Sequence, residues 1–151
     1  MFRKILVPLD GSEHSLKALD EAAQIAKIFS GKITLINVYS VQPVMMGGSS
    51  ASGYGAILTG ADVSGIVEAA QKSGNRILQD GEQRISATGV EVDKMLVEGH
   101  TVQEIVRAAS EGNFDLIVIG ARGISHFREM LLGSVIDGVI HHANCAVLVI
   151  K

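Results

Sequence analysis

Short apolar runs alternate with longer segments of helical periodicity from one end of the chain to the other. The runs lie at 5–9, 32–39, 90–97, 115–119 and 146–150, and the helical patterns lie at 14–30, 62–88, 101–111 and after 133. The first run, and the four residues after Asp115, are apolar throughout, which is typical of strands buried on both faces of a parallel sheet. The alternation therefore predicts one α/β domain over residues 1–151: an open five-stranded parallel sheet with helices on both faces.

Turn and capping residues indicate where these elements begin and end. Pro8 cannot donate a hydrogen bond to a neighbouring strand, so the first strand should end near it. Either Asp10 or Ser12 can cap the helix that follows. Asp62 and Thr101 are the expected caps of the second and third helices.

The second helix is long and follows the least regular part of the chain. Residues 40–61 are rich in Gly and Ser. A loop of this length is usually functional or disordered, and we expect it to be loosely ordered, with a lid as the alternative. Gly74 and Gly81 lie inside the helix and should weaken it locally. The stripe expected to face the sheet is Ile66, Ala69, Ala70, Ser73, Ile77 and Ile85.

A glycine pattern of the form Gly-x2-Gly-x9-Gly-Ser follows the strand at 115–119. Gly120 and Gly123 open it, and Gly133 and Ser134 close it just before a helical pattern. A phosphate chain needs close approach to the backbone, which glycine permits, and free N–H groups, which a helix N-terminus supplies. The chain has 17 glycines, so plain turns are the alternative. The fixed spacing before a predicted helix favours an anion-binding loop.

This pattern resembles the nucleotide-binding signature of the universal stress protein family. The resemblance extends to residues 4–12, which read KILVPLDGS, and to the closing run VLVI at 147–150. It implies the sheet order 3-2-1-4-5, a Rossmann-like arrangement of the adenine nucleotide α-hydrolase-like type. In that order the strands ending at Pro8 and Ile119 are neighbours where strand order reverses, which is where such sheets bind ligands. One departure is Ala146, where the family usually has a proline.

The resemblance also implies a set of nucleotide-binding positions at this edge of the sheet. They are Pro8, Leu9, Asp10, Val38, Gly120, Ala121, Arg122, Gly123, Gly133, Ser134 and Val135. The Asp10 carboxylate can accept from ribose hydroxyls or an exocyclic amine, and helix capping is its alternative role. Arg122 can pair with a phosphate or be a solvated arginine. Val38 matches a position whose backbone reads the adenine edge, although its side chain alone predicts only a core valine.

The function implied by the resemblance is adenine-nucleotide binding by a stress-response switch or sensor. ATP is the expected ligand, with ADP and AMP as alternatives, and Mg²⁺ would come only with the nucleotide. A phosphate-transferring enzyme is the second hypothesis, but the chain lacks Gly-x4-Gly-Lys-Ser/Thr, so we expect slow hydrolysis at most. A dimerisation module without nucleotide is the third, and the complete glycine signature disfavours it. We assign no metal site, because the adjacent His141 and His142 point in different directions on a helix.

Composition limits the remaining classes. The formal net charge is −3, and Lys and Arg form no cluster, which disfavours nucleic-acid binding. No apolar run reaches transmembrane length, and residues 1–4 lead straight into a strand without the regions of a signal peptide. Cys145 is the only cysteine, so no internal disulfide can form. We therefore expect a cytoplasmic protein that binds neither nucleic acid nor membranes.

The last strand predicts self-association. In the order 3-2-1-4-5 the run 146–150 lies at an edge of the sheet, and it reads AVLVI. Edge strands normally carry charges or prolines that prevent pairing with another chain, and this one has neither. Dimerisation through this strand is also common in the family. We expect a homodimer in which Val147, Leu148, Val149 and Ile150 pair with the same strand of a second copy about a two-fold axis.

Overall fold

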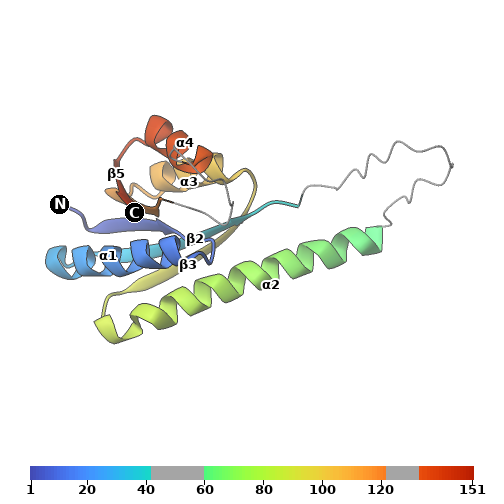
Figure 1. Cartoon of the computed structure of the whole chain (residues 1–151), viewed down its shortest axis with the longest axis horizontal. Helices are drawn as coiled ribbons and strands as arrows, with labels where there is room; N and C mark the ends of the chain where they lie inside the picture. The colour runs from blue at the N-terminus through green and yellow to red at the C-terminus, as the bar shows by residue number, and fades with distance from the viewer. Residues whose placement is uncertain (42–59, 122–132) are drawn as a thin grey trace.

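The computed structural model describes residues 1–41, 60–121 and 133–151 (Figure 1). In chain order the elements are β1 (Lys4–Pro8), α1 (Glu13–Phe29), β2 (Lys32–Tyr39), α2 (Gly60–Ile85), the 3-10 turn η1 (Ser86–Thr88), β3 (Val92–Glu98), α3 (Thr101–Glu111), β4 (Leu116–Gly120), α4 (Ser134–His142) and β5 (Ala146–Ile150). The strands form one parallel sheet in the order β3-β2-β1-β4-β5. The predicted fold class and strand order are confirmed.

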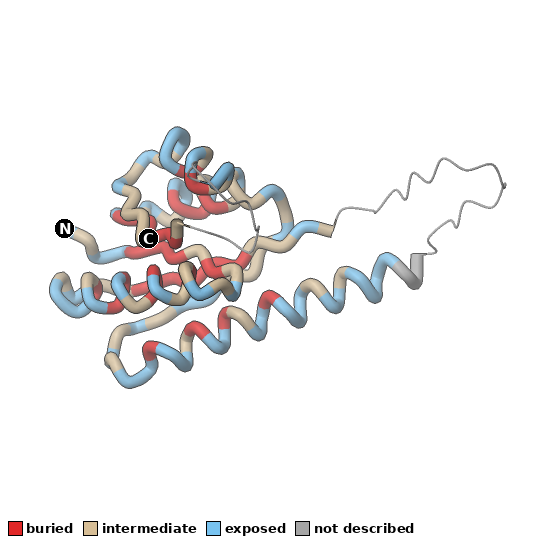
Figure 2. Tube along the Cα trace, in the orientation of Figure 1, coloured by how far each residue is buried: buried red, intermediate tan, exposed pale blue. Residues whose placement is uncertain are grey.

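The sheet separates two apolar clusters, because successive side chains of a strand point to opposite faces. Ile5 and Val7 pack with α1 and α2 on one face, whereas Leu6 packs with α3 and α4 on the other. Figure 2 shows the buried residues running along the strands and the inner sides of the helices. Because all five strands are parallel, their carboxyl ends share one edge of the sheet. A ligand can lie at that edge, between the helices of the two faces.

The long helix α2 differs from the expectation in its start and its buried face. It begins at Gly60, so Asp62 lies inside the helix rather than before it. Ile66 is 47% exposed, and the far half of α2 runs beyond the sheet (Figures 1 and 2). The buried positions of the nearer half are Gly74, Leu78, Gly81 and Ile85. Both glycines thus lie on the contact face, where a Cβ would collide with side chains of the sheet.

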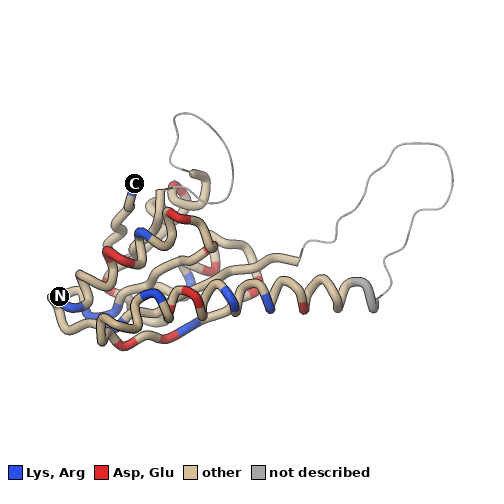
Figure 3. Tube along the Cα trace, turned by 60° about the horizontal axis from the view of Figure 1, so that its bottom comes forward, with Lys and Arg blue, Asp and Glu red and all other residues tan. Residues whose placement is uncertain are grey.

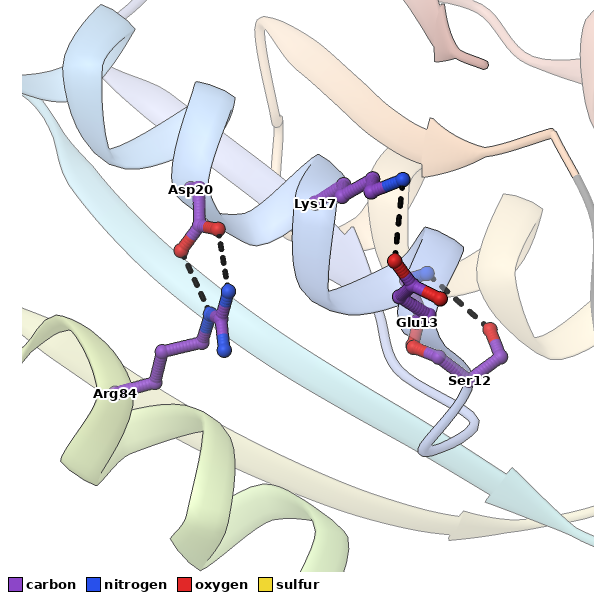
Figure 4. Close-up of polar contacts among 6 residues, drawn as sticks. Ser12, Glu13, Lys17, Asp20 and Arg84 are labelled. Carbon is purple, nitrogen blue, oxygen red and sulfur yellow. Dashed lines mark hydrogen bonds and ion pairs between the residues drawn. The ribbon is translucent and has the colours of Figure 1, made fainter.

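Polar contacts hold α1 against α2 and support α1 internally (Figure 4). The Arg84 guanidinium on α2 donates to both carboxylate oxygens of Asp20 on α1, at 2.8 and 2.7 Å. Lys17 and Glu13 form an ion pair one turn apart on α1 at 3.2 Å. Acidic and basic residues are interspersed along the chain (Figure 3). No helix in the described part combines the length and hydropathy that a membrane crossing needs.

Candidate functional site

A crevice opens at the carboxyl edge of the sheet between β1 and β4. These two strands pair only at Ile5–Leu116 and Leu6–Ile117, so their carboxyl ends diverge. A cavity of about 270 Å³ lies there, just below the range of about 300–1,000 Å³ that is usual for small-molecule sites. Its walls are Pro8, Leu9, Asp10, Ser15, Ile36, Val38, Thr101, Ile105, Ile119, Gly120, Gly133, Ser134, Val135 and Ile136. Eight of the residues predicted for the nucleotide site are among them.

The turn after β1 brings Asp10 to one wall of the cavity. Ser12, not Asp10, is the N-cap of α1, and its hydroxyl accepts from the Ser15 N–H at 3.2 Å. The Asp10 Oδ1 atom instead accepts from the Ser12 N–H at 2.9 Å, which holds the carboxylate beside the crevice. The capping role considered for Asp10 therefore belongs to Ser12.

The opposite wall is the start of α4. Gly133 is the N-cap residue, in an extended conformation and with no side-chain capping bond. The first N–H to return into the helix is that of Asp137, which donates to the Gly133 carbonyl at 3.1 Å. The N–H groups of Ser134, Val135 and Ile136 precede it and so have no intrahelical acceptor, and all three residues line the cavity. This wall presents donors and the positive end of a helix dipole.

The two glycines that line the cavity differ in what surrounds them. A Cβ on Gly120 would lie 2.5 Å from the carbonyl carbon and oxygen of His14 and 2.8 Å from the Ser15 nitrogen. Gly120 is therefore required for close packing of β4 against the first turn of α1. A Cβ on Gly133 would meet no atom of the described residues within 4 Å. The absence of a side chain at Gly133 leaves open space at the mouth of the crevice.

A third helix, α3, also reaches the cavity, although none of its residues was predicted to lie there. Thr101 was expected to cap α3, but the N-cap is His100, and Thr101 is the first helical residue. Thr101 and Ile105, one turn apart, both line the cavity. Their spacing of four, just after a strand, was the signal that could have identified them. Similarly, Ile36 precedes Val38 by two positions and shares its face of the sheet.

The remaining predicted positions are divided between the cavity and its surroundings. Val38 lines the cavity and packs with the apolar cluster beneath α3 and α4. Ala121 packs with the same cluster but is not a wall residue, and its N–H donates to the Ile150 carbonyl at 2.6 Å. Arg122 and Gly123 lie outside the described residues, as does most of the loop predicted at 40–61.

The described walls are apolar apart from a few groups. Asp10 is the only charged side chain among the wall residues described, and the hydroxyls are those of Ser15, Thr101 and Ser134. Within 1–41, 60–121 and 133–151, no three His, Cys, Asp or Glu side chains gather in an arrangement that could hold a metal ion. The arrangement can accept hydrogen bonds at Asp10 and bind an anion at the start of α4, with an apolar surface between them.

Comparison with known proteins identifies the family. The profile of the Universal stress protein family matches residues 1–151. The chain is 32% identical to the universal stress protein YxiE of Bacillus subtilis, and the match covers 100% of both chains. A universal stress protein solved in complex with cAMP is 31% identical, with a TM-score of 0.70 over 99% of this chain and 97% of that one. The Archaeoglobus fulgidus universal stress protein solved with dAMP is 26% identical, with a TM-score of 0.66 over 100% of both chains. The crevice, the strand order and these matches agree: the chain belongs to the universal stress protein family.

Proposed function

We propose that this protein binds an adenine nucleotide, with ATP as the expected ligand, in the crevice between β1 and β4. The observation that carries the proposal is the pairing of Asp10 on one wall with the uncapped start of α4 on the other. The first is an acceptor suited to ribose hydroxyls or an exocyclic amine, and the second is a donor set suited to phosphate. A ligand that satisfies both walls carries a sugar or base and an anion, as a nucleotide does.

The relatives support the adenine part of this proposal. Two members of the family with more than 25% identity were solved with cAMP and with dAMP. Both ligands contain adenine, a sugar and one phosphate. The number of phosphates that this chain prefers is part of the proposal, because a helix N-terminus binds any of them.

The cavity suggests how a nucleotide would be oriented. The phosphate would lie against Ser134 and Val135, where the free N–H groups of α4 are. The base would lie against the apolar side chains of Val38 and Ile105, with the Thr101 hydroxyl beside them. The Thr101 hydroxyl forms no hydrogen bond with another described residue, so it is available to a base or ribose.

Mass spectrometry of small molecules released from freshly purified, denatured protein tests the proposal first. Calorimetry with ATP, ADP, AMP and cAMP then ranks the ligands. Asp10→Asn should weaken binding about tenfold or more, because the loss of a charged acceptor costs about 1.5–3 kcal/mol. Glu21→Gln is the matched control, since Glu21 is exposed on α1 and is not a wall residue. Wild-type protein that binds none of the four nucleotides at millimolar concentration would refute the proposal.

The same site favours binding over rapid turnover, which suits a switch or sensor in a stress response. Mg²⁺ would enter with the nucleotide. Hydrolysis should fall well below the ~1–1000 per second typical of enzymes. Phosphate release within that range, lost in Asp10→Asn but not in Glu21→Gln, would favour an enzyme instead.

A homodimer through β5 is the proposed assembly. Among the described strands β5 pairs only with β4, and Val147 to Ile150 are all half-buried, so no described residue fully covers either face or the outer edge. The other edge strand, β3, carries exposed Asp93, Lys94 and Glu98, charges that oppose pairing with another chain. The contrast between the two edges supports association through β5.

The proposed compartment is the cytoplasm. Burial raises the pKa of the half-buried Cys145 thiol, with the Asp115 charge as the second cause, so the thiol stays protonated near neutral pH. A single protonated, partly buried cysteine fits a reducing environment. Fractionation of cells with an antibody to the protein tests this assignment.

A further inference from the structure

A buried amide on β2 holds the end of β1. Asn37 is 7% exposed and points away from the cavity, toward α2. Its side-chain Nδ2 donates to the Leu9 carbonyl oxygen at 2.7 Å. The Leu9 N–H donates to the Ile36 carbonyl at 2.9 Å. Leu9 lies just beyond the last residue of β1, and both of its backbone polar groups are therefore held by β2.

Helix α2 covers this contact through its two buried glycines. A Cβ on Gly74 would lie 2.5 Å from the Asn37 Oδ1 atom, and a Cβ on Gly81 would lie 2.5 Å from the Leu9 Cδ1 atom. The backbone of α2 therefore lies directly over the Asn37–Leu9 pair. Such close cover keeps water from the hydrogen bond, and an unpaired buried carbonyl is costly, so the Leu9 carbonyl depends on the Asn37 donor.

The residues on either side of this contact line the cavity, although Asn37 itself does not. Ile36 and Val38 flank it on β2, and Leu9 and Asp10 follow β1. The position of the Leu9 carbonyl sets the direction of the next residue, because the peptide unit between Leu9 and Asp10 is planar. The Asp10 carboxylate then accepts from the Ser12 N–H at 2.9 Å.

We propose that Asn37 is a positioning residue for the nucleotide site: through the Leu9 carbonyl it sets the direction in which the Asp10 carboxylate faces the crevice. Asn37 touches no ligand in this arrangement. Its effect on nucleotide binding rests on the proposed function, whereas its effect on Asp10 does not.

Asn37→Leu removes the donor and keeps a branched side chain of similar size. Two measurements follow: amide hydrogen exchange at Ser12, whose N–H reports the Asp10 contact, and calorimetric titration with ATP. Ser12 exchange should accelerate at least tenfold relative to Ile5 on β1, and ATP affinity should fall about tenfold. Thr34→Val is the matched control, because Thr34 is also 7% exposed on β2 but lies at the opposite end of the strand. It should change neither quantity by more than twofold.

Gly74→Ala gives a second test that keeps asparagine at position 37. Its Cβ should displace the Asn37 side chain and accelerate Ser12 exchange, so it tests the idea even if Asn37→Leu does not fold. Gly65→Ala is its control on the same helix, since a Cβ there meets nothing within 4 Å.

The two proposals fail in distinguishable ways. Wild-type protein that binds no nucleotide refutes the proposed function, and Ser12 exchange still decides the role of Asn37. Faster Ser12 exchange in Asn37→Leu, or in Gly74→Ala where Asn37→Leu does not fold, supports the positioning role when neither control is affected. Unchanged Ser12 exchange in a folded Asn37→Leu variant, or in a folded Gly74→Ala variant where Asn37→Leu does not fold, overturns it, whatever happens to ATP affinity. Equal acceleration in Thr34→Val overturns it as well.

Discussion

Replacing each of the two glycines that line the crevice by alanine should separate packing from ligand binding. The added methyl group is the same, but its surroundings differ. At Gly120 the new Cβ would lie 2.5–2.8 Å from backbone atoms of His14 and Ser15. Backbone in the first turn of α1 cannot move as a side-chain tip can, so strain must be shared between α1 and β4. At Gly133 the new Cβ would have no neighbour within 4 Å in the part of the chain that the structure describes.

The expected magnitudes follow from these surroundings. Overpacking costs about 1–3 kcal/mol, and contact with backbone puts Gly120→Ala near the upper end, about 2–3 kcal/mol. In a domain of this size that corresponds to a fall in Tm of roughly 4–12 °C. Gly133 has φ −52° and ψ 151°, a conformation open to alanine. Its loss as an N-cap should cost only about 0.5–1 kcal/mol.

Urea denaturation without ligand, followed by calorimetry with ATP, measures both effects. Gly120→Ala should lose the larger part of the stability. Gly133→Ala should remain folded and bind ATP at least tenfold more weakly, because its methyl group adds bulk to the crevice wall where the phosphate is proposed to lie. Gly133→Val should abolish binding with the fold retained. Equal stability losses at the two positions would refute the packing role of Gly120. Wild-type affinity in Gly133→Ala and Gly133→Val would refute the placement of the ligand.

Three further substitutions test other contacts. Arg84→Lys should cost about 0.5 kcal/mol in urea denaturation, because lysine cannot reproduce the two bonds to Asp20 and the pair is partly exposed; an unchanged midpoint would contradict this. The Asp115 carboxylate accepts from the backbone N–H groups of Lys4 and Arg3, and these bonds, the Lys4 bond first, lower its pKa in the folded protein. The charged carboxylate therefore stabilises the fold above its unfolded pKa of about 4, and this stabilisation is lost as the pH falls through its lower pKa in the folded protein. Asp115→Asn should therefore be less stable than wild type by about 1 kcal/mol near neutral pH and equal to it in acid, and a difference independent of pH would be contrary to this cause. Val149→Lys should convert the dimer to monomer or aggregate in light scattering, and an intact dimer would exclude the β5 interface.

The sequence predicted the elements whose signals are local. Continuous apolar runs located β1, β4 and β5 to within a residue, because polar side chains are rare in parallel strands that lie between layers of helices, although β5 itself is only half-buried. The start of α4 was equally clear, because Gly133 and Ser134 directly precede a helical pattern. The strand order came from family resemblance, since nothing in the strands themselves specifies which neighbour each one takes.

Two helix starts, at Asp62 and Thr101, were misplaced by one or two residues, and the other features that were missed depend on contacts between distant segments. The buried face of α2 was identified only in part: Ile77 and Ile85 pack on the core as expected, but the two glycines were missed because a periodicity of apolar side chains assigns no value to glycine. Gly74 and Gly81 bury backbone instead, and their lack of a Cβ lets the helix approach the sheet. Asn37 gave no signal for a similar reason. A polar residue within an apolar run only weakens the prediction of a buried strand. Its role becomes clear once its acceptor, the Leu9 carbonyl 28 positions earlier, is known.

The two strand ends that border the crevice are each held from outside it. On β4, Gly120 packs against the first turn of α1, and the Ala121 N–H donates to the Ile150 carbonyl of β5. On β1, both backbone groups of Leu9 are bonded to β2. These contacts oppose movement of either end toward the other, so we expect the crevice to persist without a ligand. Because a preformed site costs little ordering on binding, differences in affinity among nucleotides should arise at the start of α4, where Gly133 and Ser134 are exposed.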